Sequence, residues 1–131
     1  MDFEIPDELH YTADDEWVLH EDGTVTVGVT DFAQQQLGDI VYVELPTVGD
    51  QLAEGVAFGV IESVKAVSDL NAPVTGEVVA INEDLFDQPE IINEECYGEG
   101  WIIKIKPSDE DELELLLDAD GYRKLVIKRS A

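Results

Sequence analysis

The stretch GVAFGVIESVKAVSDLNAPVTGEVVAIN, residues 55–82, decides the fold class. It contains two apolar runs rich in β-branched side chains, residues 55–64 and 72–82, which are typical of strands and which we expect to pair with each other. Gly59 and Gly76 lie inside these runs and predict sharp bends or bulges. The stretch therefore indicates a small, strongly curved sheet.

Lys65 stands out within this stretch, because it is the only lysine or arginine before Lys104. Residues 1–103 carry 24 Asp and Glu residues against that one cation. Ser63 is a favourable first residue of a type I turn, which would place Val64 and Lys65 at the centre of a hairpin. Either an exposed turn tolerates any polar residue, or an amine is required there because only an amine can be acylated to an amide. Composition leaves both interpretations open.

Further β-structure is expected on both sides of the stretch, at residues 24–29, 39–45 and 101–106. Thr30 is a favourable N-cap and Gly38 a favourable C-terminal stop, so a short helix is expected between them. Strict alternation along the strand 39–45 would place two sets of side chains on opposite faces: Val41, Val43 and Leu45 on one, and Ile40 and Tyr42 on the other.

The C-terminal part contains the main helical signal. Residues 82–100 are expected to form a loop with one helical turn. Ser108 is a favourable N-cap for a helix that has acids in its first turn and basic residues late, interrupted at Gly121. Many short strands with few helices predict a mainly β barrel or sandwich with short helices, including one near the C-terminus. At 131 residues the chain is expected to form one domain, residues 1–131.

The net charge of −24 limits the partners. It repels phosphate backbones and anionic membrane surfaces, so we expect neither nucleic-acid nor membrane binding. The sequence has no apolar run near the roughly 20 residues needed to cross a bilayer and no secretory or transit pattern. A cytoplasmic protein is expected, although a mature mitochondrial form would show the same features. Adaptation to a salty cytosol is one explanation for the acidic excess.

Catalytic and metal-binding signatures are absent from the sequence. It has no phosphate-binding glycine loop, nucleophile elbow or HExxH motif. His10 and His20 have no companion at metal-ligand spacing, and both are interpreted as surface histidines. Cys96 is the only cysteine and is expected to be a small packed residue.

ESVKAVSDLNAPVTGEVVAIN, which begins at Glu62, resembles the lipoylation segment of the glycine cleavage system H protein family. Three further blocks resemble the same family, in order and at similar spacing: YTADDEWV, GTVTVGVTDFAQQQLGDIVYVELPTVGD and ECYGEGWIIKIKPSDEDELELLLDADGY. Together the four blocks cover nearly the whole chain. The resemblance is therefore more specific than a single lysine in a turn.

The resemblance implies a hybrid barrel-sandwich of the lipoyl/biotinyl-carrier type and lipoate in amide linkage on Lys65. It implies a covalent carrier subunit and not an enzyme. The expected partners are the pyridoxal-phosphate glycine decarboxylase (P protein), the tetrahydrofolate-dependent aminomethyltransferase (T protein), dihydrolipoyl dehydrogenase (L protein) and lipoate-attaching enzymes. The carrier would take the aminomethyl group of glycine from the P protein to the T protein and be reoxidised by the L protein. A monomer is expected.

The resemblance also implies roles for four carboxylates. Glu16 and Asp69 correspond to acids of a cleft that shelters the aminomethyl group, and Asp14 to a cleft-lining position with a varying side chain. Glu62 corresponds to a position read by the lipoylation enzymes. For each of the three cleft acids, an ordinary solvated carboxylate is the alternative, and for Glu62 the alternative is simple turn polarity.

Two positions depart from the family pattern. Asp15 stands where histidine is usual, which puts a pH-dependent role of that position in doubt. Cys96 replaces a proline, a change expected to loosen a loop without affecting the lipoyl arm.

Several alternatives stay open. A biotin acceptor would have methionines beside its lysine, whereas Val64 and Ala66 flank Lys65. An isolated lipoyl domain of a 2-oxoacid dehydrogenase would leave the DDEWV block and the C-terminal helix unexplained. An H-like protein that relays lipoate to other enzymes, and an unmodified acidic interaction domain, are the remaining candidates.

Overall fold

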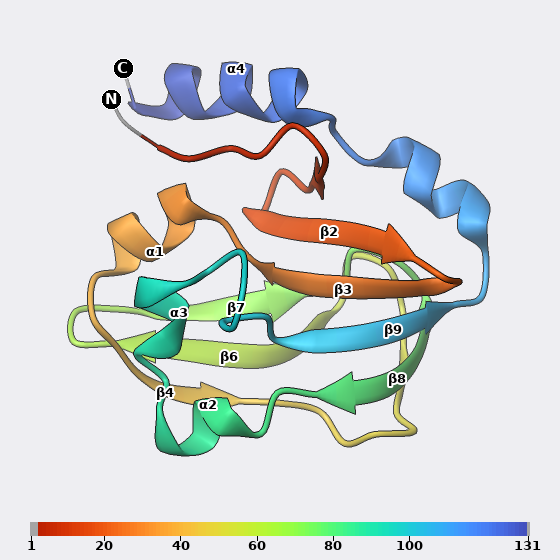
Figure 1. Ribbon diagram of the computed structural model, residues 1–131, viewed down its shortest axis with the longest axis horizontal. Coiled ribbons are helices and arrows are strands. Elements are labelled where there is room, and N and C mark those ends of the chain that lie inside the picture. Colours follow the sequence, from red (N-terminus) through yellow and green to blue (C-terminus); the bar gives the residue numbers. More distant parts are fainter. Residues whose placement is uncertain (1–2, 131) are drawn as a thin grey trace.

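The structure is a computed structural model that describes residues 3–130, with side chains for residues 3–129. Two antiparallel sheets form most of it (Figure 1). The larger sheet has the order β1 (His10–Tyr11), β2 (Glu16–Glu21), β3 (Thr24–Val29), β9 (Ile103–Pro107), β8 (Gly76–Ile81) and β5 (Gln51–Leu52). The smaller sheet has the order β4 (Ile40–Glu44), β6 (Ala57–Ser63) and β7 (Val67–Asn71). The prediction of a mainly β fold is confirmed.

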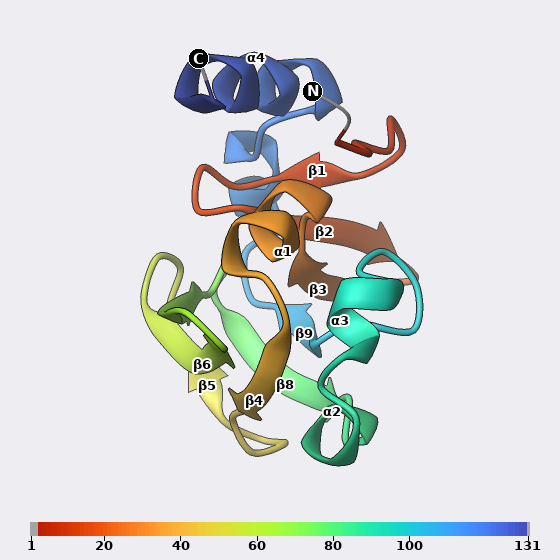
Figure 2. The same ribbon diagram turned by 90° about the vertical axis from the view of Figure 1, so that its left-hand side faces the viewer.

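Short helices surround the sheets: α1 (Asp31–Leu37), α2 (Asp84–Asp87), α3 (Ile91–Glu94), the 3₁₀ helix η1 (Glu110–Leu115) and α4 (Ala119–Ser130). Helix α4 lies across one end of the molecule, beside the N-terminal segment, and the β6–β7 hairpin projects at the left of the view, below α1 (Figure 1). Figure 2 shows α1 between β1 and the smaller sheet. None of the helices in the described part is long and apolar enough to cross a membrane.

The main core lies where the two sheets face each other. Ile61 and Leu70 of the smaller sheet share one buried cluster with Val27 and Ile103 of the larger sheet. A second cluster joins α4 to the edge of the larger sheet, where the rings of Tyr11 and Tyr122 stack with centroids 4.7 Å apart. Burial of these side chains is the main stabilising contribution, about 25 cal/mol per Å² of apolar surface. It holds α4 in place over the turn before β2.

Helix α1 forms where the sequence predicts it. The Thr30 side chain accepts a hydrogen bond from the backbone N–H of Ala33, and the N–H of Gly38 donates to the carbonyl oxygen of Gln34. Gly38 has φ +79°, a left-handed value that glycine adopts without the steric cost a Cβ would bring. The predicted N-cap and C-terminal stop are both confirmed.

The expected pairing of residues 55–64 with 72–82 is wrong. Strand β6 pairs with β4 on one side and with β7 on the other, whereas β8 pairs with β5 and β9 in the other sheet. The pattern of residues 67–71, VSDLN, is too polar for a buried strand, and for this reason β7 was missed. β7 is an edge strand, and Leu70 is its only buried residue.

The predicted alternation in the strand 39–45 is also wrong. Ile40 and Val43 are buried while Val41 and Tyr42 are exposed, because a register shift interrupts the β4–β6 pairing between Ile40 and Tyr42. An irregularity of this kind adds a residue to one strand and moves the following side chains to the other face. Alternation in the sequence cannot locate it.

The C-terminal helix is divided earlier than predicted. The 3₁₀ helix η1 is capped by Asp109 and not by Ser108, and the chain is extended at Leu116 before α4 begins. Gly121 lies inside α4 and does not interrupt it. The break arises because Leu117 pairs with Tyr11 of β1 through two backbone hydrogen bonds of 2.8 Å. Residues 82–100 contain two helical turns, α2 and α3, where one was predicted.

Of the two glycines expected at bends, Gly59 lies at a register irregularity of the β6–β7 pair, whereas the irregularity in β8 falls between Val78 and Ala80. Gly76 instead allows strands β8 and β9 to lie in close contact, because a Cβ at this position would be 2.2 Å from the backbone oxygen of Lys106. Overpacking against a fixed backbone is destabilising.

We therefore expect Gly76→Ala to lower the free energy of unfolding by about 3 kcal/mol, measured by urea denaturation. Gly98→Ala is the matched control, because its nearest heavy atom would lie 3.5 Å away, on the Glu95 side chain. Equal midpoints for the two variants would contradict the tight contact between β8 and β9.

The acidic surface predicts a salt-dependent stability. The arginines pair with Asp7, Asp15 and Asp120, but 31 acids face only 7 lysines and arginines in the sequence. Added salt shortens the Debye length from about 10 Å at 0.1 M to about 3 Å at 1 M and relieves repulsion between exposed carboxylates. The melting temperature should rise between low and molar KCl, as followed by calorimetry. A flat response would count against dominant charge repulsion.

Candidate functional site

The turn between β6 and β7 is held by Ser63. Its Oγ accepts hydrogen bonds from the backbone N–H groups of Lys65 (3.3 Å) and Ala66 (3.1 Å), and its own N–H donates to the oxygen of Ala66 (2.8 Å). The Ser63 side chain is buried, so the turn is fixed from inside. The prediction that Val64 and Lys65 occupy the centre of this hairpin turn is confirmed.

Lys65 is exposed at the tip of this fixed hairpin. Its aliphatic stem lies over the C-terminal end of α1, where Cε is 3.4 Å from the position that a Cβ on Gly38 would take. The backbone N–H of Val64 donates to the oxygen of Asp39 (3.0 Å), which joins the hairpin to the chain after α1. The structure thus offers an accessible amine on a rigid support.

A second functional element is the turn before β2, which carries three consecutive acids, Asp14, Asp15 and Glu16. Thr12 organises it: its Oγ1 accepts hydrogen bonds from the backbone N–H groups of Asp14 and Glu16, both at 3.2 Å. With both N–H groups accepted, the single hydroxyl proton is donated to Oε1 of Glu16, at 2.6 Å. The loop therefore positions the Glu16 carboxyl group directly.

Glu16 is a buried acid, 2% exposed, at the start of β2. Its other oxygen, Oε2, accepts a hydrogen bond from the backbone N–H of Asn71 at the end of β7 (3.2 Å). Burial raises the pKa of Glu16 to about 7, and the hydrogen bonds from Thr12 and Asn71 act in the opposite direction. The carboxyl group therefore changes its protonation near neutral pH.

Glu16 forms part of a cleft of about 330 Å³ beside the hairpin. The cleft lies between the acidic turn, α1 and β7, and the polar residues that line it are Asp14, Asp15, Glu16, Gln36, Ser68, Asp69 and Arg129. Asp14, Glu16 and Asp69, which come from separate parts of the sequence, are thus brought together. Asp69 is exposed on the edge strand, and Asp14 accepts a hydrogen bond from Nδ2 of Asn71 (3.3 Å).

The structure places Glu62 outside this cleft. Cross-strand pairing puts it in one row with Tyr42 of β4 and Val67 of β7, and both neighbours are exposed. Glu62 therefore accompanies the lysine on the outer surface of the smaller sheet. Its surroundings differ from those of the three cleft acids.

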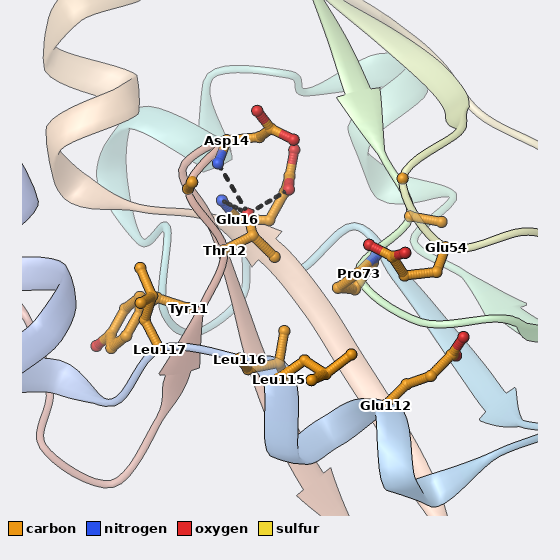
Figure 3. Close-up of a pocket in the computed structure, with 13 residues that line it drawn as sticks. Tyr11, Thr12, Asp14, Glu16, Glu54, Pro73, Glu112, Leu115, Leu116 and Leu117 are labelled. Atoms are coloured by element: carbon orange, nitrogen blue, oxygen red, sulfur yellow. Dashed lines mark hydrogen bonds between the residues drawn. The ribbon is translucent and has the colours of Figure 1, made fainter.

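A second pocket, of about 270 Å³, shares Asp14 and Glu16 with the cleft (Figure 3). Glu54 and Pro73 face the acidic turn across this pocket (Figure 3). The other labelled lining residues are Tyr11, Thr12, Glu112 and the leucines 115–117. No feature of the sequence predicted this pocket. Glu16 therefore lines both the cleft and the second pocket.

Asp15 and Arg129 form an ion pair that the sequence did not indicate. The Asp15 carboxylate accepts two hydrogen bonds from the guanidinium of Arg129, at 2.9 and 2.7 Å, and one from the hydroxyl of Tyr122 at 2.9 Å. The two residues are 114 positions apart, so spacing carries no signal. The only sequence sign is a basic residue in the last turn of a helix.

Cys96 is buried, as expected, and its backbone oxygen accepts a hydrogen bond from Nε1 of Trp17 (2.8 Å). Burial raises the pKa of its thiol to about 12, so the thiolate is strongly disfavoured near neutral pH. The hydrogen bond from Trp17 to the backbone oxygen of Cys96 ties this loop to β2.

The raised pKa of Glu16 predicts a pH-dependent stability. An ordinary glutamate has a pKa near 4.5, and the folded value is about 7. Between these values the folded state binds more protons than the unfolded state, so stability falls as pH rises. Wild type should lose about 3 kcal/mol relative to Glu16→Gln between pH 4.5 and 7, measured by urea unfolding of both proteins. A constant difference across this range would contradict the burial of an ionisable group.

Comparison with known proteins places these features in a family. The sequence model of the family described as "Glycine cleavage H-protein" matches residues 9–129. The chain is 55% identical over 123 residues to the glycine cleavage system H protein of Anaeromyxobacter sp. (strain K), covering 94% of this chain and 96% of that protein. It is 60% identical over 120 residues to the protein of that name from Psychrobacter sp. (strain PRwf-1), covering 91% and 95%.

The fold agrees with a solved structure. The chain is similar to the crystal structure of a glycine cleavage system H protein from Mycobacterium marinum, with a TM-score of 0.83 and 40% identity, over 92% of this chain and 97% of that one. This similarity confirms the predicted barrel-sandwich of the lipoyl-carrier type.

Proposed function

Because the chain belongs to the glycine cleavage H-protein family, whose members carry lipoate in amide linkage on a lysine, we propose that Lys65 is its attachment residue. The protein is a lipoyl carrier that works with the other components of the glycine cleavage system. The proposal for Lys65 is supported by the exposure of this amine on a fixed hairpin and by its place in the ESVKA segment.

The residues around Lys65 fit the group. An amide bond to Nζ needs an accessible lysine, and Lys65 is the only one before Lys104. The cleft of about 330 Å³ next to the hairpin is large enough for the end of a flexible arm, and it offers carboxylates for a cation. When bound, the dithiolane supplies the sulfur that takes up the aminomethyl group, while the chain itself is proposed to catalyse no step.

The acidic turn provides the acceptors for the aminomethyl cargo, whose amine is a cation near neutral pH. The Glu16 carboxylate, once ionised, accepts a charge-assisted hydrogen bond from this ammonium, and Asp14 lies beside it on the same wall. Asp69 adds negative charge at the rim. Holding the cargo between α1 and β7 limits the access of water to the bond that carries it.

Specific partners follow from this role. We propose that the P protein loads the cargo, that the T protein removes it and that the L protein reoxidises the dithiol. A covalent arm raises the effective concentration of the dithiol at each active site without new contacts. We further propose a cytoplasmic location, in line with bacterial relatives such as the Anaeromyxobacter and Psychrobacter proteins.

Glu62 is proposed to be read by the lipoate-attaching enzyme. Such an enzyme must bring Nζ itself into its active site, so it covers the surface next to the turn. Glu62 lies on that surface, three residues before Lys65 and outside the cleft. A role in recognition is therefore separable from a role in holding cargo.

The accessible Lys65 beside an acidic cleft is the observation that carries this proposal. Its test is glycine–bicarbonate exchange by purified P protein, with the lipoylated chain compared with the same chain lacking lipoate. Exchange should require the lipoylated form. Full lipoylation without exchange would point instead to a relay that passes lipoate to other enzymes.

A further inference from the structure

The cleft is lined by three consecutive acids and by one cation. Asp14, Asp15 and Glu16 line it together with Arg129, which is the only basic residue among its described lining residues. A guanidinium remains charged at any physiological pH. An arginine in a cleft for an ammonium group is unfavourable unless another group neutralises it.

The Arg129 guanidinium is held by three neighbouring residues. Two hydrogen bonds join it to the two oxygens of Asp15, a third reaches the oxygen of Ala13 (3.4 Å), and the Phe32 ring centroid lies 5.0 Å from Cζ. The pKa of Arg129 is raised, first by its hydrogen bonds with Asp15 and, as a smaller cause, by the charge of Asp14. Asp14 therefore already attracts the Arg129 guanidinium, and it would pair with this cation if Asp15 no longer did.

The backbone of the turn directs the three acids to different places. Asp15 has φ +71°, a left-handed value that is uncommon outside glycine, and its carbonyl oxygen accepts a hydrogen bond from the N–H of Thr30 (3.0 Å). This conformation lets Asp15 reach α4, while Glu16 and Asp14 bond to Asn71 on β7. Asp15 therefore pairs with Arg129 of α4, and the carboxyl groups of Asp14 and Glu16 are left for the cleft.

We propose that Asp15 acts as the internal counter-ion of the cleft: by binding Arg129 it keeps this cation away from Asp14 and Glu16, which remain available to the ammonium of the cargo. This inference rests on the proposed function of the cleft. Asp15 is thus a positioning residue that acts through Arg129 and does not touch the cargo.

The proposal predicts that Asp15→Asn shortens the lifetime of the aminomethyl-loaded protein and that Arg129→Gln lengthens it. Asparagine at position 15 tolerates a positive φ and can still accept a hydrogen bond from Tyr122, so Asp15→Asn removes mainly the charge. The freed guanidinium should occupy Asp14 and Glu16 or repel the ammonium, and the lifetime of the aminomethyl-loaded protein should fall roughly fivefold or more. Arg129→Gln should lengthen the lifetime, because it removes the cation and frees Asp15.

The double variant Asp15→Asn with Arg129→Gln separates a counter-ion from a structural clamp. If Asp15 acts by neutralising Arg129, removing the arginine restores the lifetime toward that of wild type. If Asp15 only fixes α4, the double variant stays as short-lived as Asp15→Asn, and the proposal is overturned. Arg129→Lys leaves the turn intact but cannot form the two-point pair, so it should also shorten the lifetime. Arg123→Gln, on the same helix, is the matched control.

A second readout uses the chain without lipoate. Carboxyl ¹³C NMR gives the pKa of Glu16, whose charged neighbours are Asp14, Asp15, Asp69 and Arg129 on the cleft side and Glu54 and Glu112 on the other. Asp15→Asn should lower this pKa for two reasons: it removes the charge of Asp15, which raises the pKa, and it lets a free cation approach. Only the second effect needs Arg129, so the pKa in the double variant should lie above that in Asp15→Asn. Equal pKa values in these two variants would contradict the counter-ion role.

The two readouts also distinguish failure of the proposed function from failure of the inference. If wild-type protein protects its cargo no better than Glu16→Gln, the cleft does not hold the cargo. The NMR titration still decides whether Asp15 shields Glu16 from Arg129, because it needs neither lipoate nor a partner enzyme.

Discussion

Lys65→Arg should abolish lipoylation and reduce glycine cleavage to the background without the carrier. Arginine keeps the positive charge and much of the size of lysine, but its guanidinium does not form the amide bond that an amine forms. The hairpin should persist, because Ser63 holds the turn through backbone N–H groups. Intact mass after expression with lipoate, and the overall rate with the P, T and L proteins, measure the two effects.

Lys124→Arg is the matched control, since Lys124 is an exposed lysine far along the chain on α4. It should be lipoylated and active like wild type. If Lys65→Arg still gained a lipoyl group, another lysine would be the acceptor and the assignment of the hairpin would be wrong.

Glu16→Gln should shorten the lifetime of the aminomethyl-loaded protein by about tenfold or more. A hydrogen bond to a charged partner contributes about 1.5–3 kcal/mol, and a neutral amide keeps only part of it. Release of ammonia and formaldehyde from isolated loaded protein is the measurement. Glu77→Gln, an exposed glutamate on β8, is the control and should not change the rate.

The same experiment has a pH signature. The ionised carboxylate holds the cargo, and the pKa of Glu16 is about 7 in the structure, so protection in wild type should weaken as pH falls through neutrality. The cargo's positive charge moves this transition to lower pH. The Glu16→Gln protein should show no such transition. Parallel pH profiles for the two proteins would contradict the role of Glu16.

Local signals in the sequence predicted local structure well. Thr30 and Gly38 defined α1, and Ser63 placed Lys65 at the centre of its turn, because caps and turns depend on a few neighbouring residues. The mainly β class followed from the short β-branched runs. The same runs did not tell which strands pair, since pairing of β8 with β9 is decided by packing between distant segments.

The site was predicted to a different extent for each residue. Lys65, Glu16 and Asp69 came from the resemblance, and the structure brings the two acids to one cleft beside the hairpin. The Asp15–Arg129 pair was not predicted, because the contact depends on how α4 crosses the turn before β2. The shift in β4 that exposes Tyr42 beside Glu62 was not predicted for a different reason: a register irregularity leaves no periodic sign in the sequence.

Peptide mapping by mass spectrometry, on the wild-type chain produced with its lipoate-attaching enzymes, tests the central claim most directly. The account predicts a lipoyl increment on the peptide that contains Lys65, with fragment ions that place it on this residue. An unmodified Lys65 in a folded chain, or an increment found on Lys104 or a later lysine, would contradict it.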